Sequence, residues 1–193
     1  MVDRRRPTGR LVIGGVADTE VDGEIVQIVT DSAATVSAVF EEKVRHVLAA
    51  NGITGVSDTA WYTVPPVAWT LERIGEAAGR TVLRRIGGRV VTDDRSLSVP
   101  PEPGRAFVAL AEFVSEDVHR GPAADRVAAC RARRREPGRW RLAAVDGYQY
   151  PPAFAEGVFR ATAATAAGVA PERVAVEAVT PAADERHAVA LSW

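Results

Sequence analysis

The fold is decided by the stretch RWRLAAVDGYQYPPAF, which covers residues 139–154. Residues 139–145 are predicted to form a strand, and the aromatic and proline residues after them form a tight turn into a helix over 153–167. A last strand over 186–193 carries apolar side chains at every second position and ends on Trp193. Because Trp193 shares the apolar face of that strand, we expect the chain to end inside its core, as a complete compact domain.

The chain before this stretch is mostly helical in pattern. Apolar residues at three- and four-residue steps predict four helices, over 32–51, 66–78, 80–86 (closed by Gly87-Gly88) and 105–119. Strands are expected over 10–15 and 174–179, whereas 23–29 and 123–135 suit either a helix or a strand. Residues 1–9 are expected to be a flexible arm, and 10–193 a single domain with a proline-rich loop at 92–104. The pattern predicts an α+β fold with helices packed on one face of a mostly antiparallel sheet.

Composition excludes several classes of protein. The 24 basic and 25 acidic residues give a net charge of −1, so no overall field favours nucleic acid or an anionic membrane. No apolar run approaches the roughly 18 residues that span a bilayer, and the N-terminal apolar run is too short for a signal peptide. We therefore expect a cytoplasmic protein with no membrane span. Cys130 is the only cysteine, which excludes an intrachain disulfide and a thiolate zinc site, and no metal or cofactor is expected.

Three stretches, taken in order, carry a resemblance to a known superfamily. They are residues 44–86, where Trp61-Tyr62 precedes Pro66-Val-Ala-Trp69; residues 117–121; and the turn Tyr148–Phe154 with the helix and closing strand after it. In this order the chain resembles the haem-NO-binding-like and 4-vinyl-reductase-type ligand-binding domains of bacteria and archaea. The resemblance implies an α/β domain that binds a small molecule between its helices and its sheet. The cysteines that members often carry, and the Tyr-x-Ser-x-Arg signature that holds haem propionates, are absent here.

The polar residues give no catalytic constellation. None of the serines sits in a Gly-x-Ser-x-Gly elbow, and the adjacent acidic pairs point apart. His46 lies off the apolar stripe of its helix and is expected at the surface. His119 is either a cation at a helix end or a ligand contact, and His187 is expected to be a buried neutral side chain. The basic run Arg131–Arg139 is either a phosphate-binding surface or a solvated loop in an arginine-biased sequence.

Aromatic residues form the candidate ligand-binding set. Such side chains either line pockets for flat apolar molecules or simply fill the core, and the resemblance to ligand-binding domains favours a pocket. Together with His119, the predicted site residues are Trp61, Trp69, Phe107, Phe113, Tyr148, Tyr150 and Phe154. The leading hypothesis is a non-enzymatic sensor or carrier that binds a small apolar or aromatic molecule between the helices at 66–86 and 105–119 and the C-terminal sheet, with signalling through a partner or a self-dimer. One alternative is a ligand-free homodimeric interaction module. Another is an enzyme acting on a tetrapyrrole-like substrate.

Overall fold

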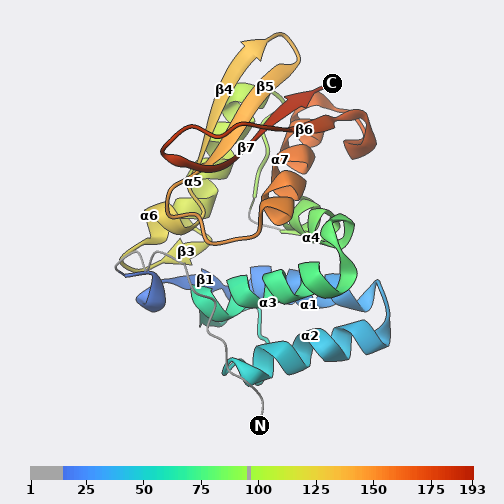
Figure 1. Cartoon of the computed structure of the whole chain (residues 1–193), viewed down its shortest axis with the longest axis vertical. Helices are drawn as coiled ribbons and strands as arrows, with labels where there is room; N and C mark the ends of the chain where they lie inside the picture. The colour runs from blue at the N-terminus through green and yellow to red at the C-terminus, as the bar shows by residue number, and fades with distance from the viewer. Residues whose placement is uncertain (1–14, 95–96) are drawn as a thin grey trace.

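The computed structural model describes residues 15–94 and 97–193, so the predicted arm at 1–9 and nearly all of the predicted strand at 10–15 lie outside the described part. Helices pack against two antiparallel sheets, which confirms the α+β prediction (Figure 1). Buried apolar residues from both sides of Pro100 belong to one continuous core, as a single domain requires. No helix within the described ranges has both the length and the apolar character needed to cross a bilayer.

The larger sheet contains the strands predicted at the C-terminus. It has the order β4-β5-β7-β6, with β4 at Cys130–Glu136, β5 at Arg139–Val145, β6 at Ala175–Val179 and β7 at Glu185–Ser192. Leu142, Val189 and Leu191 are buried on the face toward α7 (Pro152–Ala167) and α5 (Pro103–Glu116). Trp193 is part-buried against the core, and its backbone N–H donates to the Gly138 carbonyl at 3.2 Å. The C-terminal third therefore folds over the central helices.

A second, smaller sheet was not predicted from the sequence. Its order is β2-β1-β3, formed by Trp61–Thr63, Glu20–Asp22 and His119–Arg120. The register pairs Val21 with Tyr62 on one side and with His119 on the other. This sheet corrects the prediction that a helix runs to residue 119, because α5 ends at Glu116 and His119 belongs to a strand.

The predicted helix over 32–51 is wrong, because two helices cover this region. Asp22 caps α1 (Gly23–Ala34), which settles the ambiguity at 23–29 in favour of helix. The chain breaks after Thr35, and the Ser37 side chain accepts a hydrogen bond from the Phe40 N–H to start α2 (Ala38–Ala50). Because the break changes the helical phase, Val36 and Val39, which continue the apolar spacing, are 43% and 64% exposed instead of buried.

The predicted end of a helix at Gly87-Gly88 is also wrong. After α3 (Val64–Ala78), α4 runs from Arg80 to Asp93 through both glycines and crosses α7. A Cβ atom on Gly87 would lie 2.1 Å from the Phe154 carbonyl oxygen, and one on Gly157 would lie 2.0 Å from the Arg84 carbonyl oxygen. The glycines therefore let two helix backbones touch, where a side chain would keep them apart.

An ion pair fastens the same helix crossing. Glu156 of α7 is 4% exposed, and its carboxylate accepts hydrogen bonds from Arg80 at 2.8 Å and Arg84 at 2.6 Å, both on α4. Removing a carboxylate from water is unfavourable, so a carboxylate is buried only where charged donors satisfy its oxygens. The α4–α7 pair is thus held by backbone contact at the glycines and by charge at Glu156.

Candidate functional site

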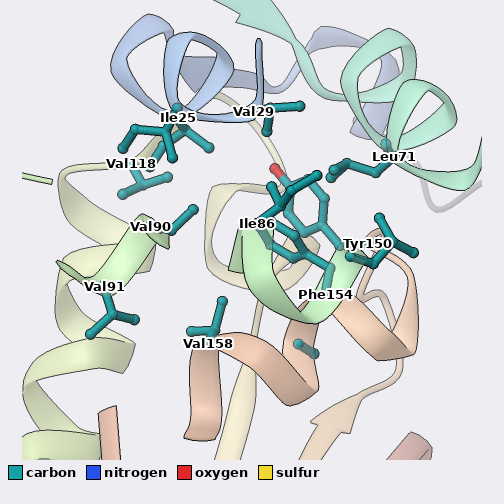
Figure 2. Close-up of a cluster of buried hydrophobic side chains, with 14 of the residues drawn as sticks. Ile25, Val29, Leu71, Ile86, Val90, Val91, Val118, Tyr150, Phe154 and Val158 are labelled. Carbon is teal, nitrogen blue, oxygen red and sulfur yellow. The ribbon is translucent and has the colours of Figure 1, made fainter. Parts of the chain in front are cut away.

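A small cavity of about 40 Å³ lies at the centre of the core. Its walls come from α1, α4, α5, α7 and the beginnings of β3 and β4, so almost every layer of the fold contributes to it. Half of the lining residues are aliphatic, namely Ile25, Val90, Leu110, Val114, Val118, Ala128 and Val158, and Phe159 adds an aromatic ring. Figure 2 shows part of this region, where Ile25, Val90 and Val118 face Phe154 and Val158 across the core.

Five of the eight predicted site residues line this cavity: Phe113, His119, Tyr148, Tyr150 and Phe154. The ring of Tyr150 lies 5.5 Å from the ring of Phe154, and the ring of Tyr148 meets the ring of Tyr150 edge-on at 5.8 Å. These residues come from α5, β3, the turn before α7, and α7 itself. The turn that the sequence singled out therefore supplies much of the aromatic wall.

Local backbone geometry places the two tyrosines. Gly147 has a φ of 108°, a conformation that favours glycine, and it turns the chain sharply out of β5. The Gln149 N–H then donates to the Val127 carbonyl at 2.8 Å, and its side-chain amide donates to the Gly147 carbonyl at 2.6 Å. These two hydrogen bonds hold Gln149 in place, and the tyrosines on either side of it, Tyr148 and Tyr150, are both buried in the core.

His119 and Tyr150 form a buried polar pair in the cavity wall. The two ring nitrogens of His119 lie 2.7 Å from the Val114 carbonyl oxygen (Nδ1) and 2.6 Å from the Tyr150 hydroxyl oxygen (Nε2). A carbonyl can only accept, so Nδ1 carries the proton and Nε2 accepts the hydrogen bond that the Tyr150 hydroxyl donates. Burial lowers the pKa of His119 to about 4, so the imidazole is neutral near pH 7.

The other titratable groups at the cavity are also held in their neutral forms. Burial raises the pKa of the Cys130 thiol to about 11, and it raises the pKa of both Tyr148 and Tyr150 well above the ordinary value for tyrosine. Within the described residues, the Tyr148 hydroxyl has no hydrogen-bond partner. These four side chains, His119 included, are therefore neutral near pH 7 and present uncharged hydrogen-bonding groups in the cavity wall.

The three remaining predicted site residues lie away from the cavity. Trp61 is on β2, with the Arg120 guanidinium 4.4 Å above its ring, and Trp69 is on α3, with Arg73 at 5.7 Å. Phe107 is buried on α5 but packs against Trp140 at a ring distance of 5.2 Å. Each of these aromatics already has a stacking or cation–π partner on the surface or in the core.

The other two histidines and the basic run do not line the cavity. His46 is exposed on α2, as predicted, and His187 is part-buried on β7, where burial lowers its pKa. The run at 131–139 covers most of β4, the turn after it and the first residue of β5. Arg131 pairs with Asp184, and Arg139 lies 3.5 Å from Glu136, so at least these two members of the run are neutralised by carboxylates.

Across residues 15–94 and 97–193, no group of three or more His, Cys, Asp or Glu side chains could hold a metal ion. His119 uses both ring nitrogens in protein hydrogen bonds, as described above. No protein-family model matches this chain, and no curated protein does either. The geometry of the cavity is therefore what bears on function.

Proposed function

We propose that this protein is a non-enzymatic sensor or carrier domain that binds a small, mainly apolar molecule in the central cavity. The observation that carries the proposal is the convergence of Phe113, His119, Tyr148, Tyr150 and Phe154 on one apolar space inside the core. An apolar pocket with a few convergent polar groups is the default binding site of a globular protein. The resemblance to haem-NO-binding-like and 4-vinyl-reductase-type domains supports the same assignment.

The size of the cavity sets the size of the ligand. An apolar cavity of about 150 Å³ holds benzene, whereas this one measures about 40 Å³. A molecule of only a few non-hydrogen atoms enters without rearrangement, and an aromatic ligand requires the surrounding helices to move apart. Occupancy by a larger ligand would therefore change how α5 and α7 pack, which is a physical route from binding to a signal.

The polar groups set the character of the ligand. The Tyr148 hydroxyl is free to donate, and the Tyr150 oxygen keeps acceptor capacity after it donates to His119. The best ligand is accordingly an apolar molecule with one small polar group, such as a carbonyl or a hydroxyl.

Filling the cavity should abolish binding. Val90 and Val118 are nearly fully buried in its wall, so the double variant V90I/V118I adds two methyl groups to a space of about 40 Å³. Xenon and acetone should bind this variant at least tenfold more weakly than the wild type. Shifts of methyl resonances in NMR spectra measure the binding. The stability of the folded state should change by no more than about 1.5 kcal/mol, because the added methyl groups fill a void.

The control is V108I on α5, where Val108 is 57% exposed and the same methyl group meets solvent. A second readout comes from Cys130, the sole cysteine, which lines the cavity and should react more slowly with a thiol reagent when a ligand is bound. Equal xenon and acetone binding in V90I/V118I and wild type would contradict the proposal. So would the absence of any perturbation at the cavity methyl groups in wild type.

A second candidate function is a homodimeric interaction module, and the exposed face of α2 favours it. Val39, Glu42, Lys43 and His46 occupy one helical stripe and line an open groove of about 710 Å³ beside α3. In an antiparallel pair of α2 helices whose two-fold axis passes between Glu42 and Lys43, Glu42 of one copy faces Lys43 of the other. The stripe is thus self-complementary, as an isologous contact requires.

Reversing this charge pattern should separate the dimer. If a second copy covers the stripe, the wild type elutes as a dimer in sizing with light scattering. K43E shifts it toward monomer at the same concentration, because repulsion between carboxylates of the two copies replaces both attractions. The double variant E42K/K43E restores the complementarity and should restore the dimer. A wild type that is monomeric at 100-fold higher concentration would exclude this candidate and leave the cavity proposal unaffected.

A further inference from the structure

A second hollow lies beside the α4–α7 crossing. It is a groove of about 490 Å³ between α4, α7 and the short helix η2 (Pro171–Arg173). Four arginines line it: Arg84, Arg85, Arg89 and Arg160. We propose that this groove binds a phosphate group, held by Arg85 and Arg160. The proposal is independent of the ligand in the central cavity.

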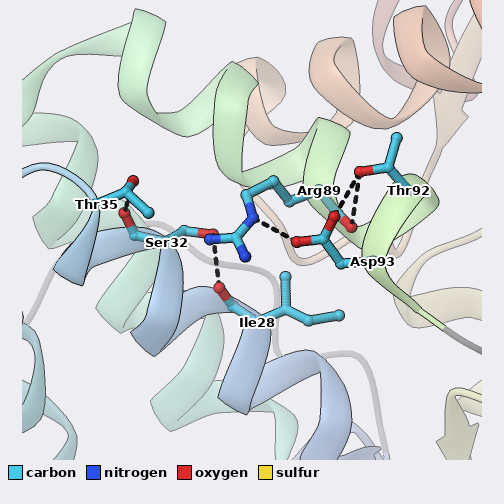
Figure 3. A network of polar contacts seen from close by, with 6 residues as sticks. All are labelled: Ile28, Ser32, Thr35, Arg89, Thr92 and Asp93. Atoms are coloured by element: carbon cyan, nitrogen blue, oxygen red, sulfur yellow. Dashed lines mark hydrogen bonds and ion pairs between the residues drawn. The ribbon is translucent and has the colours of Figure 1, made fainter.

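Two of the four arginines are already committed to protein partners. Arg84 donates through Nε to the Glu156 carboxylate at 2.6 Å. Arg89 pairs through Nε with Asp93 at 2.5 Å and donates through a terminal nitrogen to the Ser32 hydroxyl at 3.1 Å, so it reaches toward α1 (Figure 3). Arg84 therefore connects α4 to α7, and Arg89 connects α4 to α1.

Arg85 and Arg160 have no such partners. Among the described residues, neither forms an ion pair with a carboxylate. The Nε of Arg160 is buried and has no hydrogen-bond acceptor, an arrangement that is uncommon in native proteins. An oxyanion in the groove would supply that acceptor and balance the charge of both guanidinium groups. Their planar, forked donors suit the tetrahedral oxygens of a phosphate.

The shape of the groove also suits a compact anion. Gly88 and Gly157 both line it, so its wall lacks side chains where α4 and α7 cross. Thr81, which lines it as well, adds a hydroxyl donor. One acidic residue, Glu172 of η2, is part of the lining, and its carboxylate repels an anion. Removing the charge of Glu172 must therefore strengthen phosphate binding, which tests the direction of the expected effect.

The experiment is calorimetric titration of the full chain with inorganic phosphate and pyrophosphate at low ionic strength. R85A should weaken binding about tenfold, the loss expected for one charge-assisted hydrogen bond at an exposed residue. R160K keeps the charge, removes the Nε donor, and should also weaken binding. E172Q should tighten it several-fold. The control is R73A on α3, which removes the same charge from an exposed arginine outside the groove.

Vesicles of phosphatidylcholine with and without phosphatidic acid distinguish a lipid headgroup from a free phosphate. If the protein sediments with phosphatidic acid vesicles and R85A weakens this binding, the ligand is a membrane phospholipid. If phosphate binds in calorimetry but the protein does not sediment, the ligand is a soluble phosphorylated molecule. Absence of both kinds of binding, equal weakening by R73A and R85A, or unchanged binding in E172Q would overturn the proposal. V90I/V118I should bind phosphate as the wild type does, so failure here and failure of the cavity proposal are separable.

Discussion

Replacing Gly157 with alanine should destabilise the protein by about 3 kcal/mol or more, a large share of the roughly 5–15 kcal/mol by which a typical domain is stable. The added Cβ would lie 2.0 Å from the Arg84 carbonyl oxygen, and backbone atoms of α4 cannot move away as the tip of a flexible side chain can. The helices would have to separate along their whole crossing, which would also pull Arg84 away from Glu156. Urea denaturation followed by circular dichroism measures the loss.

Gly88 provides the matched control on the same crossing. A Cβ atom there would have no neighbour closer than 3.8 Å, so G88A should fold normally. It should be more stable than wild type by up to about 1 kcal/mol, because alanine favours a helix interior over glycine by about that amount. If G88A and G157A lost similar stability, close backbone approach would not be the reason for glycine at 157.

The stability of the protein should fall as the pH is lowered from 7 to 5, because of His119. In the folded protein the pKa of His119 is about 4, whereas an unfolded chain has the ordinary value of about 6.5. Well above pH 6.5 both states are neutral and the histidine contributes no pH dependence. Below pH 6.5 the histidine is protonated in the unfolded state but stays mostly neutral in the folded state until the pH approaches 4. The free energy of unfolding therefore falls by about 2 kcal/mol at pH 5 and about 3 kcal/mol at pH 4.

Chemical denaturation of wild type and H119Q at pH 7, 6 and 5 measures this effect. The variant should lose most of the pH dependence, and His187, whose pKa burial also lowers, should account for part of the remainder. The window stops at pH 5 because the hydrogen bond from Arg141 lowers the pKa of Glu185 to about 2, and stability from that pair is lost only below about pH 4.5. Parallel pH profiles for wild type and H119Q would show that His119 is not buried as a neutral group.

Several periodic elements could be predicted from the sequence, although the break inside the helix expected over 32–51 could not, and neither could the short strands. The patterns for α3, α7, β5 and β7 are local and agree with the structure. The small sheet has strands of two or three residues, too short to carry an alternation. At Gly87, the propensity of glycine predicted a helix end, but contact with α7 outweighs a penalty of only about 1 kcal/mol.

The candidate site divides in the same way. Tyr148, Tyr150 and Phe154 lie within seven residues of one another, in the turn before α7 and its first residues, so their sequence proximity could reveal them as a group, and all three line the cavity. Ile25 and Cys130 line it too, yet they are brought there by α1 and β4, whose places depend on the whole fold. His119 was correctly predicted as a site candidate, but it was expected at a helix end and lies on a strand. The sequence could not show this strand, because His119 pairs with Val21, which lies far away in the sequence.

That pairing has a kinetic consequence. The ladder between β1 and β3 joins chain segments separated by most of the central helices, and a loop of that length must close before His119 is fixed. Local helices form on a much faster timescale than such non-local contacts. We therefore expect the cavity to form late in folding, only after Val21 and His119 have come together.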